Sequence, residues 1–235
     1  MSVLMGSGAL ALWLDVAPAL DRETDAWYID EHMPERIDIG GYLRARRYAA
    51  IEGAPQYLTL FEAQTPSALA SEGYLRLVSR ISEQSQRIRA GFSNVVRNTF
   101  AVRQSRGRGI GAIMATVRLT LLDASGAAAA ATAVDAQAQP LLRRRGVVGV
   151  HWLQTAPAVR ARMDAVRAVG QADGSVDYAL LIEVTRARDV RELRADVLAS
   201  AAFARLGFAE QGFGIYSLLY EVSGRAAETV LGDRQ

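Results

Sequence analysis

Apolar and polar residues follow one another along the chain in an order of elements that occurs twice. In the first half, strand-length apolar runs alternate with longer segments in which apolar residues recur at helical spacing. Asp21 is the predicted N-cap of the first helix, Pro34 follows its end, and Gly73 is the expected break in the second helix. The predicted strands are 9–16, 40–51, 56–63 and 94–103, and the predicted helices are 21–33 and 67–90.

The second half repeats the order of strand, helix, strand, strand, helix, strand. The glycine-rich segment 105–111 precedes a strand instead of following one, so it is interpreted as a linker and not as a phosphate-binding loop. This repeat divides the chain, and we expect one unit over 1–105 and another over 110–224. The predicted strands are 113–122, 147–155, 176–184 and 214–222, the helices are 127–139 and 188–206, and an added helical turn is expected at 161–169.

This order predicts an α+β protein of two tandem, ferredoxin-like βαββαβ repeats. Each repeat forms a four-stranded antiparallel sheet with helices on one face, so the other face needs a cover. Packing the two sheets face to face provides it. The third strands support the repeat, since each opens with a tyrosine and closes with a glutamate, Tyr57 to Glu62 and Tyr178 to Glu183.

The first half resembles a known family in three segments, in order and spacing. They read DAWYIDEHMPER (25–36), GYLRARRY (41–48) and PQYL (55–58). They are similar to the pattern of EthD-like proteins in the dimeric α/β-barrel superfamily, which includes muconolactone isomerases, antibiotic-biosynthesis monooxygenases and haem-degrading enzymes. The resemblance implies that single-unit relatives dimerise to close a barrel that this chain forms within one molecule. It places any site of the family type in the first half, because the second half has alanines in place of the motif.

The composition excludes several kinds of chemistry. The chain has no cysteine and no lysine, which excludes disulfides, thiol nucleophiles, cysteine-bound metals and Schiff bases. A formal net charge of +2 without interleaved aromatic residues gives no indication of nucleic-acid binding. No apolar run is long enough to span a bilayer and no basic region opens the chain, so a cytoplasmic location is expected.

Two histidines remain, and His32 is the first catalytic candidate. Its imidazole titrates near neutral pH, so it suits a general base or acid. Glu31 is expected to orient it or to act as a second acid or base. Trp27 and Tyr28, one turn earlier, are the expected aromatic walls of a substrate site. The alternative is that His32 only packs or caps the helix end, held by Glu35 or a backbone carbonyl.

The arginines of the second strand offer an anion-binding group. Alternation places one set of side chains on one face (Tyr42, Arg44, Arg46, Tyr48) and another set on the opposite face (Leu43, Ala45, Arg47). Arg47 is the predicted anion stabiliser and Tyr57 a predicted substrate contact. The alternative for an inward arginine is an ion pair with Glu62, Asp15 or Glu31. His151 corresponds to Arg46 and is expected to be a hydrogen-bonded residue of the inter-sheet interior.

These observations favour binding of a small hydrophobic or aromatic ligand, or cofactor-independent chemistry of an oxygenase, isomerase or cyclase type on an aromatic, lactone or polyketide-like compound. No cofactor and no metal is expected, because two distant histidines without cysteine leave only carboxylates to complete a metal shell. A non-catalytic binding or assembly module and a haem-binding protein are the alternatives. Self-association beyond a barrel closed within one chain stays open.

Overall fold

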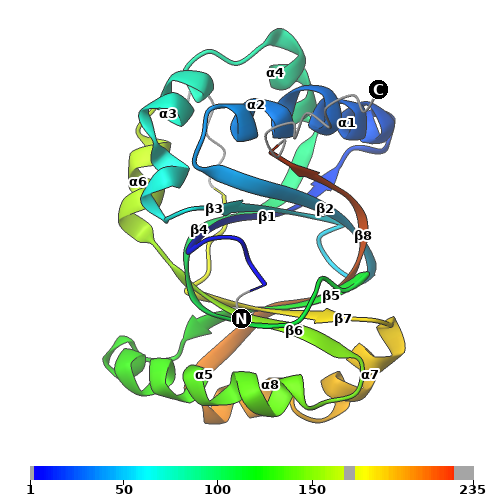
Figure 1. The fold of residues 1–235 in the computed structure, drawn as a ribbon, viewed down its shortest axis with the longest axis vertical. Coiled ribbons are helices and arrows are strands. Elements are labelled where there is room, and N and C mark those ends of the chain that lie inside the picture. The colour runs from blue at the N-terminus through cyan, green and yellow to red at the C-terminus, as the bar shows by residue number, and fades with distance from the viewer. Residues whose placement is uncertain (1–2, 167–172, 225–235) are drawn as a thin grey trace, which may run out of the picture.

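Eight antiparallel strands close into a single barrel (Figure 1), in the order β1-β3-β2-β8-β5-β7-β6-β4. The structure is a computed structural model that describes residues 3–166 and 173–224. The strands are β1 (Gly8–Val16), β2 (Tyr42–Gly53), β3 (Tyr57–Ala63), β4 (Phe92–Gly107), β5 (Ile113–Leu121), β6 (Val147–Thr155), β7 (Tyr178–Val184) and β8 (Phe208–Ser223).

Each half of the chain contributes four neighbouring strands to this barrel. The first half supplies β4, β1, β3 and β2, and the second half supplies β8, β5, β7 and β6. The expected α+β class with antiparallel, ferredoxin-like sheets is confirmed. The two sheets are also hydrogen-bonded to each other, through β2 with β8 and β4 with β6. These cross-pairs leave none of the barrel strands with an unpaired edge.

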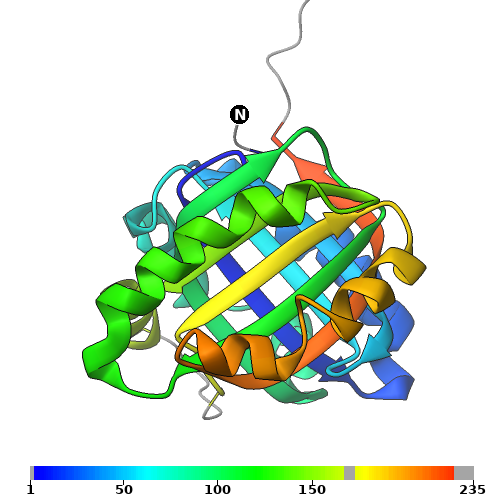
Figure 2. The same ribbon diagram turned by 90° about the horizontal axis from the view of Figure 1, so that it is seen from below.

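Helices cover the barrel on two opposite sides (Figures 1 and 2). One side carries the first-half helices and α6, and the other carries α5, α7 and α8. The short turns η1 (Pro18–Leu20), η3 (Ser67–Ala70) and η4 (Ala124–Gly126) lead into helices. The helices are α1 (Asp21–Trp27), the π-helical η2 (Tyr28–His32), α2 (Met33–Asp38), α3 (Glu72–Val78), α4 (Glu83–Ala90), α5 (Ala127–Leu142), α6 (Pro157–Asp164), α7 (Ala187–Ala195) and α8 (Ser200–Arg205).

Three hydrophobic clusters follow from this arrangement. Alternation along β1 places Ala9, Ala11 and Trp13 inside the barrel and Leu10 beneath the first-half helices. The same alternation along β5 separates the interior from a cluster under α5, α7 and α8, centred on Trp152. The barrel interior is therefore a filled core, and each helix layer packs on its own outer face.

Several predicted helix boundaries were wrong. The first helix does not stop before Pro34 but continues through η2 and α2 to Asp38. Asp21 is the first residue of α1 and makes no capping hydrogen bond there. The second helix is divided by serine N-caps, and Gly73 lies inside α3. Segment 188–206 forms two helices, α7 and α8. In segment 161–169, α6 ends at Asp164, and residues 167–169 lie outside the described residues.

The faces of β2 also differ from strict alternation. The register of β2 against β3 shifts between Tyr42 and Arg44, so Leu43 is an extra residue. Tyr42 therefore lies on the helix side with Ala45, whereas Arg46 and Tyr48 point into the barrel. The bulge reverses the prediction for Tyr42 only. Segment 105–111 is likewise not wholly a linker, because β4 runs on to Gly107.

Candidate functional site

A cavity of about 260 Å³ lies between the outer face of the first-half strands and the helices above them. Its floor is apolar and comes from β1, β3 and β4, with Leu10, Leu12, Leu14, Phe61 and Phe92. The helices supply its roof, with Trp27, Tyr28, His32, Arg36, Tyr74 and Arg89. An apolar cavity with a few polar groups is the usual form of a small-molecule site.

The π-helical turn η2 explains why three ring side chains meet here. The N–H of Met33 bonds to the carbonyl of Tyr28, five residues back, because Pro34 removes the donor that would continue regular α-helical bonding. The wider turn brings His32 to both preceding aromatic residues. The ring centroids are 4.1 Å apart for Trp27 and His32, and 4.9 Å apart for Tyr28 and His32. Trp27, expected beside Glu31 and on a different face, therefore shares the cavity with Tyr28 and His32.

His32 is 7 % exposed and its ring faces the cavity. Among the described residues no side chain or backbone group bonds to its imidazole, so neither Glu35 nor a carbonyl holds it. Burial, followed by the nearby guanidinium groups of Arg36, Arg89 and Arg47, holds the pKa of His32 well below its usual range. The ring is therefore neutral at pH 7, and one ring nitrogen carries a free lone pair.

Arg36 is one of several cavity residues, with Tyr74 and Arg89, that the sequence pattern did not indicate. It is 3 % exposed, and its Nη1 donates to the carbonyl of His32 at 2.7 Å. Its guanidinium lies 5.8 Å from the centre of the Phe61 ring and 5.7 Å from that of Tyr74. No carboxylate of the described chain forms an ion pair with it. A helix continued through Pro34 would have revealed it, because residues four apart share a face.

Glu31 does not orient His32. Its carboxylate accepts hydrogen bonds from Ser85 at 2.7 Å and Ser82 at 2.9 Å, on the side of η2 that faces α4. Partial burial acts to raise the pKa of Glu31, but these hydrogen bonds outweigh it and the pKa is lowered. Ser85 also accepts from the Trp27 indole at 2.9 Å. Glu31 thus fastens η2 to α4 and fixes the Trp27 ring.

Arg47 and Tyr57 lie beside the cavity but do not line it. Arg47 donates to Asp25 at 2.7 Å, and its guanidinium lies 4.3 Å from the centre of the Tyr28 ring. Tyr57 donates to Asp21, and this bond together with partial burial raises the pKa of its phenol to about 12. Both side chains are engaged in holding α1 on the sheet. The expectation that Arg47 faces a substrate anion therefore does not match its placement.

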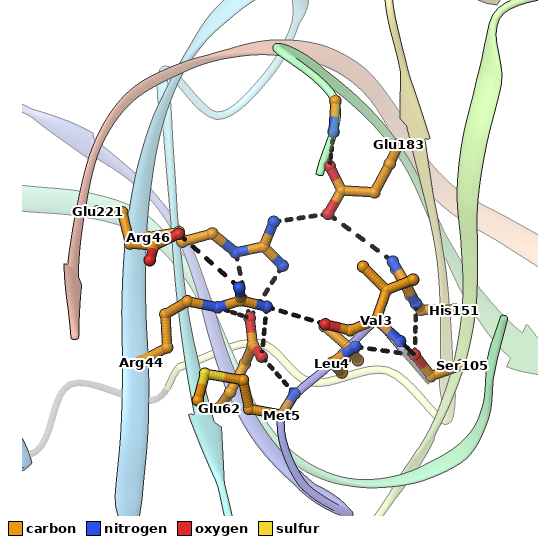
Figure 3. Close-up of polar contacts among 11 residues, drawn as sticks. Val3, Leu4, Met5, Arg44, Arg46, Glu62, Ser105, His151, Glu183 and Glu221 are labelled. Carbon is orange, nitrogen blue, oxygen red and sulfur yellow. Dashed lines mark hydrogen bonds and ion pairs between the residues drawn. The ribbon is translucent and has the colours of Figure 1, made fainter. Parts of the chain in front are cut away.

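The barrel interior contains a second polar group, shown in Figure 3. Arg46 joins the two halves, since it pairs with Glu183 at 2.5 Å and with Glu62 at 2.9 Å. His151 lies in the same cluster, 3.0 Å from Ser105. Burial acts to raise the pKa of Glu183, and the nearby His151 ring, 3.7 Å away, together with the charge of Arg46 reverses this effect. The inward arginine thus has the Glu62 partner considered in the sequence analysis.

The described residues contain no group of three or more histidine, aspartate or glutamate side chains that could hold a metal ion. No described helix combines the length and the apolar composition that crossing a membrane requires. The polar groups that line the cavity include the imidazole of His32, the guanidinium groups of Arg36, Arg89 and Arg97, and the carboxylate of Asp173, which pairs with Arg97 at 3.1 Å.

No family model matches the chain, and no curated protein matches it in sequence. Solved structures do match. An anthrone oxidase-like protein is 11 % identical with a TM-score of 0.61, covering 92 % of each chain. The chain has the dimeric α/β-barrel, ferredoxin-like fold.

Two further structures share this dimeric α/β-barrel fold. A proposed monooxygenase from Fusobacterium nucleatum is 8 % identical with a TM-score of 0.56, over 94 % of this chain and 96 % of that one. A haem-binding protein from Thermus thermophilus is 12 % identical with a TM-score of 0.53, over 92 % of each chain. At these identities the likeness establishes the fold alone.

Proposed function

We propose that the protein binds a small aromatic or polyketide-like molecule in the first-half cavity and removes a proton from it without a bound cofactor. One observation carries this proposal: a buried, neutral imidazole and a buried guanidinium that has no carboxylate partner among the described residues line the same largely apolar cavity. A neutral imidazole accepts a proton, and a guanidinium stabilises the negative charge that remains. Such a pair suits a substrate with a phenol or an acidic C–H next to a carbonyl.

In the proposed step a C–H or O–H bond of the ligand breaks. The proton moves to a ring nitrogen of His32, and the electron pair moves onto the ligand oxygen. Arg36 stabilises this anion, in the role first expected of Arg47. Trp27 and Tyr28 hold the aromatic rings of the ligand. The resulting enolate or phenolate, which is nucleophilic at carbon, is the common starting point of isomerisation, of cyclisation and of reaction with dioxygen.

The structural neighbours support the proposed reaction class only in that two of them have names that refer to oxidation. An anthrone oxidase-like protein and a proposed monooxygenase have the same fold. The motif segments at 25–36 and 41–48 are the ground for proposing, further, that this is an EthD-like protein. The repeated order of elements is the ground for proposing that its two halves arose by tandem duplication.

Haem does not fit this cavity. The cavity volume of about 260 Å³ is smaller than the roughly 300–1,000 Å³ of sites for drug-sized ligands. The His32 ring is packed against Trp27 and Tyr28, which would have to move before a flat macrocycle could approach. We therefore propose no haem ligand for His32, although a protein of the same fold is named for haem binding.

Anthrone is a suitable probe, because its methylene hydrogens are acidic and their exchange in D₂O is visible by NMR. The intact chain should accelerate this exchange. His32→Gln removes the base and keeps a polar side chain of similar size, so the acceleration should fall at least about 100-fold. His151→Gln, a substitution of the other histidine, lies in the barrel interior and is the matched control.

Fluorescence quenching of the tryptophans by anthrone measures binding separately. His32→Gln should retain this quenching, and Arg36→Met should weaken it. Binding without any exchange would overturn the catalytic part of the proposal and leave a binding module. Equal exchange in the intact chain and in His32→Gln would remove His32 from the role of base.

A further inference from the structure

Arg118 is a buried cation at the opposite end of the barrel interior from the Arg46 cluster. It lies on β5, four residues beyond Met114, whose partner in the β5–β7 register is Glu183. It is 7 % exposed, and its guanidinium lies 5.6 Å from the centre of the Trp13 ring. An arginine in this position is expensive to bury unless its charge is compensated.

The protein compensates Arg118 only in part. Its Nη2 donates to the carbonyl of Ala54 at 2.7 Å, and within the described chain its Nε–H has no acceptor. No carboxylate among the described residues forms an ion pair with it. Burial accordingly lowers the pKa of this guanidinium. Arg46 differs in its charge partners, because two glutamates meet its charge.

Room for this guanidinium depends on a glycine. A Cβ on Gly212 of β8 would stand 2.1 Å from Nη2 of Arg118 and 2.7 Å from its Cζ. Residue 212 pairs directly with Arg118 across the strands. The barrel therefore leaves a space that an ordinary side chain would fill, and the cation occupies it.

Arg118 borders an open recess of about 440 Å³ at this end of the barrel, walled by Ala54, Pro55 and Val96. Two carboxylates also border the recess, and both already have partners. Asp15 accepts from the Gln56 backbone at 2.6 Å and from Asn94 at 2.7 Å. Asp173 pairs with Arg97 at 3.1 Å.

We propose that this recess binds a small monocarboxylate whose carboxyl group pairs with Arg118. The recess adjoins the cavity at His32 and shares Val95 and Asp173 with it, but Arg118 lines the recess and not that cavity. The guanidinium has donors to spare, and a planar carboxylate matches them. The apolar wall suits a short hydrocarbon portion. A doubly charged phosphate is disfavoured, because Asp15 and Asp173 would repel two charges more strongly than one.

Sodium butyrate and sodium phosphate at equal ionic strength test the proposal on the intact chain. Butyrate should raise the melting temperature in a concentration-dependent way, since a ligand that binds only the folded state stabilises it. Arg118→Met, which keeps the apolar stem, should weaken butyrate binding about tenfold or more in calorimetric titration. Arg118→Lys should restore part of it. Arg36→Met is the matched control, a substitution of a buried arginine in the other cavity, and should keep the butyrate response.

A crystal grown with bromobutyrate would locate the bromine beside Arg118. The proposal is overturned if butyrate does not stabilise the intact chain, if Arg118→Met responds to it as the intact chain does, or if phosphate binds more tightly than butyrate. If Arg118→Met does not fold, butyrate titration of Arg118→Lys and the position of the bromine still test whether the carboxylate binds at Arg118. We expect anthrone binding and exchange not to depend on Arg118. A negative butyrate result therefore leaves the proposed function untouched, and a negative anthrone result leaves the Arg118 site untouched.

Discussion

The two helix layers of the molecule rest on similar sheets but are packed differently. Under α5, α7 and α8 the layer is packed with aromatic rings, and Phe208 contacts both Trp152 and Tyr178. Under the first-half helices the corresponding layer contains the cavity with His32 and Arg36. The same topology therefore gives a core packed with aromatic rings on one side and a layer with a cavity on the other.

Strand register shows where the difference arises. Arg47 pairs with Thr59, the third residue of β3, and Trp152 pairs with Leu180, the third residue of β7. In the second half a tryptophan fills the space above the sheet. In the first half an arginine holds Asp25 at the edge of the layer instead. One exchange of residue type at an equivalent position thus accompanies the opening of a cavity.

Trp152→Ala should have the largest effect on stability. It removes a fully buried ring from a filled layer, so the free energy of unfolding should fall by about 3–5 kcal/mol. Trp27→Ala should cost less, because Trp27 already borders a cavity. Urea unfolding of both variants measures the difference. A larger loss for Trp27→Ala would contradict the contrast between a filled and a hollow layer.

Arg46→Met tests whether the interior joins the two layers into one cooperative unit. Removing one partner of a buried ion pair leaves a buried charge, at a cost of about 3 kcal/mol. Breaking a buried pair typically costs about 3–5 kcal/mol. We expect the lower value because Glu183 still accepts a hydrogen bond from the Gly111 backbone at 3.0 Å. Arg144→Met, which breaks an exposed pair with Asp196, is the control and should cost under about 1 kcal/mol. Calorimetry should show one transition in each case.

Ser85→Ala tests how η2 and Trp27, which form part of the roof of the cavity, are held against α4. The substitution leaves the buried Trp27 indole without its acceptor and Glu31 without one donor, so unfolding should become about 1–2 kcal/mol easier. The pKa of Glu31 should rise as well, because hydrogen bonding is what lowers it. Ser67→Ala, an exposed serine on the same side, is the control. An unchanged Glu31 titration in NMR would contradict the assignment.

The cavity-containing layer should make stability depend on pH, because it holds the buried His32. His32 is neutral when folded and binds a proton below about pH 6.5 when unfolded, so stability is lost as the pH falls below that value. Between pH 7 and pH 5.5 the loss should be about 1 kcal/mol greater in the intact chain than in His32→Gln. Denaturant unfolding at both pH values measures it. Equal losses would mean that His32 is protonated in the folded state.

Much of the candidate site could be predicted from local sequence, and the rest depended on one turn. Trp27, Tyr28 and His32 lie within one short segment, so a helix there predicts the contact of Tyr28 with His32, whereas the contact of Trp27 with His32 depends on the π-helical turn η2. Arg36 was missed because Pro34 suggests the end of a helix, whereas η2 lets the helix continue. Arg47 was assigned to a ligand because nothing in the sequence pairs it with Asp25, 22 residues earlier.

The order of elements, the antiparallel sheets and the restriction of the motif with Trp27, Tyr28 and His32 to one half follow from the sequence alone. Periodicity and residue type are local properties, so they can be read along the chain. The tertiary structure alone decided that β2 pairs with β8 and β4 with β6 to close the barrel, that Arg46 meets Glu183 137 residues away, and that one layer contains a cavity. Those outcomes depend on which distant side chains fill a shared volume and neutralise a shared charge, and spacing along the chain does not encode either.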